Sequence, residues 1–133
     1  MRKLATAVIA TAALLSAPAL LAKPRLTGEE RLAKLLEGRE AGKPTSCLPS
    51  WETREMQVID KVALVYGRGD TIWVNRPDNA STLDDDEILI TKNSGSQLCK
   101  LDIVQTMDRS GHFITGFVSL TNFVPYKKVA KAN

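Results

Sequence analysis

The sequence predicts a mainly β protein, with a short N-terminal helix followed by a small antiparallel β barrel or sandwich of about six strands, closed by one disulfide. From residue 47 onward, short apolar runs alternate with turn residues, which is typical of an all-β unit. The chain has only two cysteines, Cys47 and Cys99. Its 133 residues, 44% hydrophobic and 25% charged, fit one small domain. A barrel and a sandwich give the same alternation, so both remain open.

The N-terminal 22 residues have the pattern of a secretory signal peptide. Arg2 and Lys3 precede an apolar, Ala-rich run that extends to Ala22. A retained membrane anchor is the alternative, but polar residues and a proline interrupt the run. We expect cleavage after Ala22, which removes the whole run, with cleavage after Ala19 as the alternative. The mature chain is therefore expected to be periplasmic or secreted, without stable membrane insertion.

The charge balance argues against a nucleic-acid partner. Removing Arg2 and Lys3 with the signal lowers the net charge from +3 to +1. Nucleic-acid-binding domains usually carry a clustered basic face and a clearly basic pI. The partner is instead expected to be an envelope protein or ligand.

Export also determines how the cysteines are interpreted. In an oxidising compartment, two cysteines in a short chain predict a disulfide, here Cys47–Cys99. A metal site that uses both cysteines and His112, or a reactive thiol, is the alternative. Neither has supporting spacing, because the chain contains no C-x-x-C or H-x-x-x-H motif. No metal or other cofactor is predicted.

One helix is predicted from Gly28 to about Gly38. Thr27 and Glu30 form a capping-box pattern at its start. Its apolar stripe consists of Leu32, Leu35 and Leu36. The stripe is narrow, so the helix either packs on the domain or forms a mobile arm. The divisions expected along the chain are a signal peptide (1–22), a helix and linker (23–46), an antiparallel β domain (47–126) and a basic flexible tail (127–133).

The expected strands differ in whether one or both of their faces are buried. They span residues 55–59, 62–66, 71–75, 88–91, 101–107 and 113–120, with 123–126 as a further edge. The 62–66 run is apolar on both faces and is expected to be central. In the 101–107 run, Leu101, Ile103 and Met107 alternate with Asp102 and Thr106, which predicts one face in water. Gly116 marks a bulge or bend in the strand around it.

Six of the seven aromatic residues fall at strand-like positions, where core packing explains them. Trp51 is the exception and either packs on the disulfide or forms an exposed anchor for a partner. The longest irregular stretch of the β unit, from Arg76 to Asp86, is also a candidate binding loop. The candidate partner surface therefore consists of Trp51, Arg76, Asp78, Asn79, Asp84, Asp85 and Asp86.

Neither a metal centre nor a catalytic centre is predicted. The acidic run from Asp84 to Glu87 lacks the alternating ligands and the glycine of a calcium loop, which favours a solvated segment. His112 is the only imidazole and lies in a turn sequence. A serine, His112 and Asp108 arrangement has no supporting nucleophile motif. No catalytic residue is therefore assigned.

Several ordered segments resemble a group of small exported proteobacterial proteins of unknown function. They are Val74-Asn75-Arg76-Pro77, Leu83-Asp84-Asp85-Asp86, Gly95-Ser96-Gln97-Leu98-Cys99, Asp102-Ile103-Val104, Gly116-Phe117-Val118-Ser119-Leu120 and Phe123-Val124-Pro125-Tyr126. The likeness covers most of residues 28–126. It implies a periplasmic protein with a helix-plus-β layout, and it supplies no activity or site residues.

These observations together predict a non-enzymatic exported binding or structural module of the bacterial cell envelope. One alternative is an inhibitor of an envelope hydrolase, which would insert the rigid 76–86 loop into an active site. The other is a small hydrolase that uses His112.

Overall fold

The computed structural model describes residues 22–92 and 95–130, so the expected signal peptide lies outside the described residues except for Ala22. The described chain contains a helix α1 (Gly28–Leu36) and a 3₁₀ turn η1 (Ala80–Thr82). Its strands are β1 (Arg39–Ala41), β2 (Cys47–Pro49), β3 (Met56–Ile59), β4 (Ala63–Tyr66), β5 (Thr71–Asn75), β6 (Ile88–Thr91), β7 (Gln97–Cys99), β8 (Ile103–Met107), β9 (Ile114–Ser119) and β10 (Phe123–Lys128).

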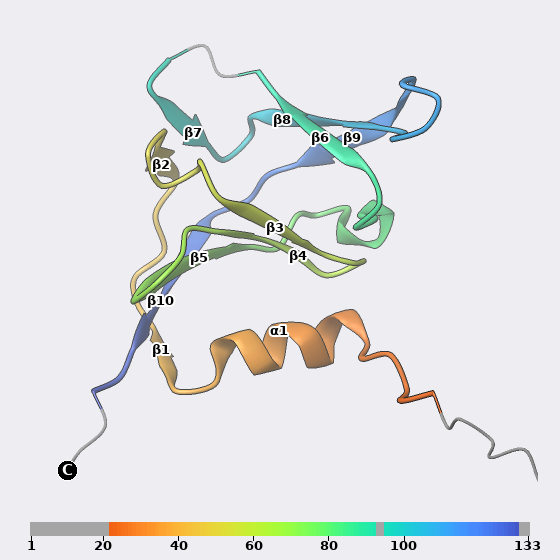
Figure 1. The fold of residues 1–133 in the computed structure, drawn as a ribbon. Helices are drawn as coiled ribbons and strands as arrows, with labels where there is room; N and C mark the ends of the chain where they lie inside the picture. The colour runs from red at the N-terminus through yellow and green to blue at the C-terminus, as the bar shows by residue number, and fades with distance from the viewer. Residues whose placement is uncertain (1–21, 93–94, 131–133) are drawn as a thin grey trace, which may run out of the picture.

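These elements form three layers (Figure 1). The helix α1 lies against one face of a five-stranded sheet of order β1-β10-β5-β4-β3. A two-stranded sheet, β2-β7, and a three-stranded sheet, β6-β8-β9, lie on the other side. All the strand pairs are antiparallel. The mainly β class and the N-terminal helix are confirmed, but the described strands form three open sheets and close no barrel.

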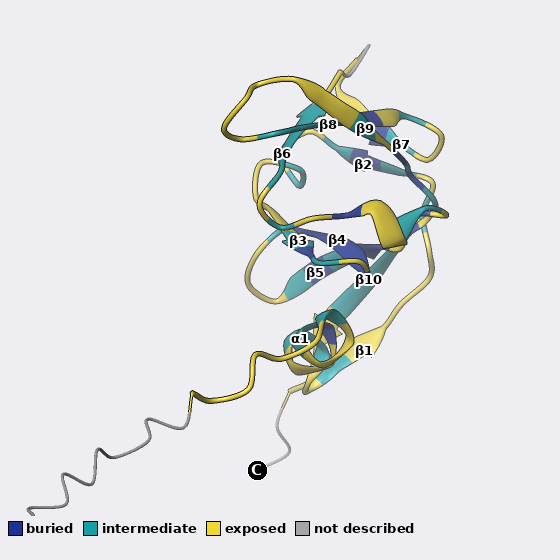
Figure 2. Cartoon of the chain, turned by 90° about the vertical axis from the view of Figure 1, so that its right-hand side faces the viewer, coloured by how far each residue is buried: buried dark blue, intermediate teal, exposed yellow. Residues whose placement is uncertain are grey.

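The five-stranded sheet separates two hydrophobic clusters. Toward the helix, the buried cluster consists of Leu32, Ile59, Val62, Ala63, Val65, Ile72 and Val74. Toward the other two sheets, it consists of Leu48, Leu64, Tyr66, Leu83, Leu98, Val104, Val118, Leu120 and Phe123. Successive residues of β4 enter opposite clusters, so the prediction of a central strand with two apolar faces is confirmed. Figure 2 shows this burial between the layers.

The capping box expected at the start of the helix is present. The Thr27 hydroxyl accepts the Glu30 backbone N–H at 3.3 Å, and a Glu30 carboxylate oxygen accepts the Thr27 N–H at 2.7 Å. Gly28 allows a close approach, because a Cβ at this position would lie 2.2 Å from the Asp60 carbonyl oxygen. The leucine stripe packs on the sheet, so the helix belongs to the domain. Within the described residues, no helix is long and apolar enough to span a membrane.

Three short strands were not predicted from the sequence. β1 lies in the expected linker and pairs with the end of β10, which continues through Lys127 and Lys128. Its three residues, Arg-Glu-Ala, show no apolar alternation, so only the tertiary contact defines the strand. The other two, β2 and β7, pair with each other and carry the two cysteines.

The 101–107 run has one face toward water, as its alternation predicts, but the buried face is the opposite of the expected one. In β8, the buried side chains are those of Val104 and Thr106, whereas Ile103 is 57% exposed. Thr106 is accommodated because its hydroxyl forms a 2.8 Å hydrogen bond with the hydroxyl of Thr115. The register of the β8–β9 pair shifts beside Gly116, where Thr115 is the extra residue of a β-bulge.

Candidate functional site

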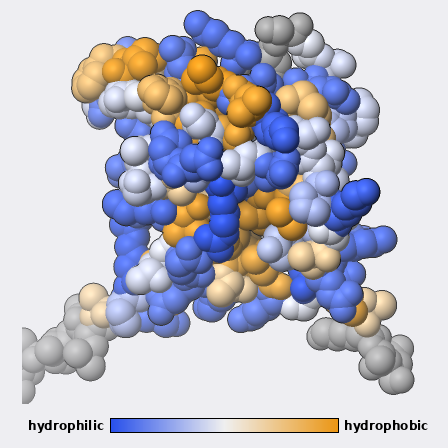
Figure 3. All heavy atoms as spheres, turned by 180° about the vertical axis from the view of Figure 1, so that it is seen from behind, coloured by the Kyte–Doolittle hydropathy of each residue, from blue (hydrophilic) through white to orange (hydrophobic). Residues whose placement is uncertain are grey.

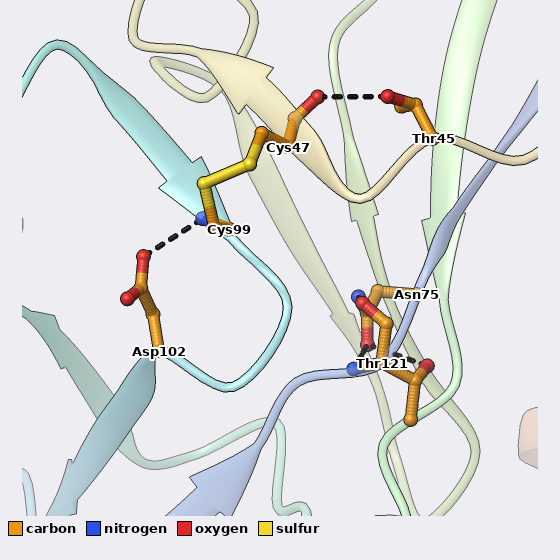
Figure 4. The surroundings of a disulfide bond; sticks show 6 residues. All are labelled: Thr45, Cys47, Asn75, Cys99, Asp102 and Thr121. Atoms are coloured by element: carbon orange, nitrogen blue, oxygen red, sulfur yellow. Dashed lines mark hydrogen bonds between the residues drawn. A yellow bond between two sulfur atoms is a disulfide. The ribbon is translucent and has the colours of Figure 1, made fainter.

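The predicted disulfide is present and joins β2 to β7 through two half-buried cysteines (Figure 4). Cys47 and Cys99 are directly opposite each other in the β2–β7 pair. The Cys99 N–H donates to an Asp102 carboxylate oxygen at 2.7 Å, and the Thr45 hydroxyl donates to the Cys47 carbonyl at 3.2 Å. The neighbours Leu48 and Leu98 are buried, so this bond holds a structural junction of the core.

At its start, the 76–86 loop is fixed to the helix. The Arg76 guanidinium donates two hydrogen bonds to the Glu29 carboxylate, at 2.8 and 3.1 Å. These hydrogen bonds, more than the charge alone, hold the pKa of Glu29 below its ordinary value. Arg76 thus has a partner within its own chain, although it remains exposed.

At its acidic end, the loop is fixed to the helix again. Arg31 donates to Asp85 at 2.8 Å, and the Arg25 guanidinium lies 3.7 Å from the same carboxylate oxygen. The Arg31 hydrogen bond is the main cause of the lowered pKa of Asp85, with the charges of both arginines adding to it. Asp60, Asp84 and Asp85 place carboxylate oxygens within 4.8 Å of one another. The two arginines supply positive charge to this group.

Asn79 attaches the middle of the loop to the free edge of β9. Its side-chain NH₂ donates to the Phe117 carbonyl at 2.7 Å, and its side-chain oxygen accepts the Ser119 N–H at 3.1 Å. These are the contacts that a neighbouring strand would make, so this part of the edge is already occupied. The neighbouring Asp78 is exposed, as are Asp84 and Asp86.

The other residues singled out from the sequence lie in turns. Trp51 is 66% exposed, so its ring is not buried on the disulfide. The Asp108 carboxylate accepts the backbone N–H groups of Ser110 and Gly111, which shapes the β8–β9 hairpin. His112 is exposed and has a positive φ of 53° in the same turn. The Asp108 carboxylate therefore has a local role in the turn.

The three-stranded sheet presents a largely apolar surface that was not predicted from the sequence. We call it the outer face. On β8, the outward residues alternate with the buried Val104 and Thr106, and the residues that pair with them on β6 and β9 point to the same side. The outer face consists of Ile88, Ile90, Ile103, Gln105, Met107, Ile114, Phe117 and Ser119. Phe117 is 58% exposed and Ile114 is 50% exposed. The expectation that core packing explains Phe117 is therefore wrong, as it is for Phe113, which is 59% exposed.

The strand register places the outer-face residues in adjacent rows. One row crosses all three strands through Ile90, Gln105 and Phe117, and the next through Ile88, Met107 and Ile114. Figure 3 shows apolar residues gathered over the upper part of the molecule, where this sheet lies. Single exposed apolar residues are ordinary, but a contiguous apolar patch indicates an interaction site.

Comparisons with known proteins identify no relative: no family model, curated protein or solved structure matches this chain.

Proposed function

We propose that this chain is an exported, non-enzymatic binding module of the bacterial cell envelope, and that it binds a protein partner through the outer face. The observation that carries the proposal is the exposure of Ile103, Ile114 and Phe117 on one side of a sheet whose other side is already buried. Aromatic and large aliphatic side chains are the groups that protein interfaces bury at their centres.

The stability of the folded chain does not explain why these exposed side chains are large and apolar. Val104 and Val118 already fill the inner side of the same strands and are 0% exposed. An outer residue that gains no burial contributes little to stability and leaves apolar area in water. A partner that covers the outer face would remove this area from water.

The 76–86 loop gives less support to the alternative of a hydrolase inhibitor. Arg76, Asn79 and Asp85 form hydrogen bonds to α1 or β9. These contacts hold the loop in place, which suits an inhibitor, but they also occupy its main polar groups. The apolar outer face is therefore the stronger candidate for a partner surface.

Two features support the export part of the proposal. The Arg2-Lys3 start and the following Ala-rich run have the pattern of a signal peptide. The Cys47–Cys99 disulfide is typical of proteins in oxidising compartments. A mature mass that begins at Lys23, or at Leu20 for the earlier cut, would support export, whereas a chain retained from Met1 in the membrane fraction would contradict it.

The binding surface is tested by photo-crosslinking in cells that produce the full chain. We expect a photoreactive phenylalanine analogue at position 117 to form a discrete adduct with a protein. The same analogue at position 34, an exposed site on the helix, serves as the matched control and should form none. Equal crosslinking at both positions, or none at 117, would contradict the proposal.

A further inference from the structure

The outer face contains no charged side chain at its eight outward positions on the described strands. Six of these residues are apolar, and the other two are Gln105 and Ser119. Two such surfaces can approach each other without burying an unpaired charge or opposing like charges. The formal net charge of the whole chain is only +3, so long-range repulsion between copies is weak.

The centre of the outer face is also self-complementary. Gln105 is the middle residue of β8, which is the central strand of the sheet. Its side-chain amide has both donors and acceptors, so it can hydrogen-bond to an identical amide. Ile90 and Phe117 lie on either side of it in the same row.

The free edge of β9 is a less favourable place for association. Strand addition needs unpaired backbone groups, and Asn79 already bonds the Phe117 carbonyl and the Ser119 N–H. The outer face has no such cover within the described part of the chain. Association is therefore expected face to face.

From these observations we propose that the occupant of the outer face is a second copy of this chain, packed sheet to sheet about a twofold axis that passes over Gln105. The inference rests on the proposed function and names its partner. A twofold interface uses the same patch on both copies, so each outward position must be compatible with the contacts this symmetry creates. Packed β-sheets lie about 10 Å apart, which lets their side chains interdigitate.

The symmetry fixes which residues meet. With the axis along β8, Gln105 faces Gln105 of the second copy and Met107 faces its counterpart. Phe117 then faces Ile90 of the second copy, and Ile114 faces Ile88. Each of these four contacts pairs an apolar side chain with another, or an amide with an amide. With the axis across the strands instead, Gln105 still faces itself.

The test uses the expectation that Gln105 faces Gln105 of the second copy for either direction of the axis. Both cysteines of the chain are in the disulfide, so a Gln105→Cys variant of the full chain carries one free thiol. We expect it to form a covalent dimer under mild oxidation much faster than Ser81→Cys, an exposed control on η1. In sedimentation equilibrium, the wild-type protein should dimerise with rising concentration. Phe117→Ser should weaken dimerisation by about tenfold or more while the circular dichroism spectrum is unchanged.

Two results separate this inference from the proposed function. If Gln105→Cys reacts no faster than the control and the wild-type protein stays monomeric, the second copy is excluded as the occupant. An adduct at position 117 with a different protein would then leave the proposed function intact. No adduct at position 117 in cells, together with a monomeric protein, would overturn both.

Discussion

Replacing both Cys47 and Cys99 by alanine is expected to lower the free energy of unfolding by about 4 kcal/mol. The disulfide joins residues 52 positions apart, so it removes many conformations from the unfolded chain. It also lies beside Leu48 and Leu98, where the two-stranded sheet contacts the core. In a domain of this size, that loss is a large share of a typical total stability. Urea denaturation of the variant and the wild type measures the difference.

Reduced wild-type protein provides the matched control for this experiment. Dithiothreitol should shift the urea midpoint of the wild type toward that of the double alanine variant, and it should not change the variant itself. A variant with the wild-type midpoint would show that the bond contributes nothing to the fold.

Phe123→Ala is expected to cost about 3 to 5 kcal/mol of unfolding free energy. Phe123 is 0% exposed, and its ring packs edge-on against that of Tyr66 at a centroid distance of 5.7 Å. The same burial raises the pKa of the Tyr66 hydroxyl above its ordinary value. Removing the Phe123 ring leaves a cavity where the five-stranded sheet meets the other two. Chemical denaturation followed by circular dichroism measures the loss.

Phe117→Ala is the control, because it removes the same ring from a strand of the same domain. Phe117 is 58% exposed, so we expect its loss to change the free energy of unfolding by less than about 1 kcal/mol. Similar losses for the two variants would contradict the division between core and outer face described above.

Much of the fold is predictable from local sequence patterns. The limits of β5 and β6 match their predicted ranges, and β4 is buried on both faces, as its apolar run indicates. The helix begins where the Thr27–Glu30 capping box indicates. Strand β1 was not predicted, because its three residues, Arg-Glu-Ala, carry no periodic signal and their pairing with β10 depends on distant residues.

The orientation of β8 shows why the candidate site was not predicted. Apolar residues occur on both sides of this strand, at Ile103 and Met107 on one and at Val104 on the other. Alternation therefore does not indicate which side of the strand is buried. The more hydrophobic side, with Ile103 and Met107, is the one that faces outward. The hydrogen bond between the hydroxyls of Thr106 and Thr115 accommodates the buried Thr106, and it depends on the register shift between β8 and β9 beside Gly116.

The predicted candidate surface combines the longest irregular loop of the β unit with Trp51, the aromatic residue outside the strand pattern. Its residues are indeed close to water, but Arg76 and Asp85 find partners on α1, 47 and 54 positions away. Asn79 finds its partners on β9. Such long-range pairs are not visible in a single sequence. Trp51 remains exposed, as one of the two expectations for it required.

Oxidative footprinting of Phe117 and Trp51 tests the central claim most directly. Both aromatic side chains are exposed in the isolated chain, so each should be modified readily by hydroxyl radicals in dilute purified protein. In the intact envelope, a partner on the outer face should protect Phe117 and leave the modification of Trp51 unchanged. Protection of Trp51 with an unprotected Phe117 would contradict the account and place the partner at the β2 end of the molecule.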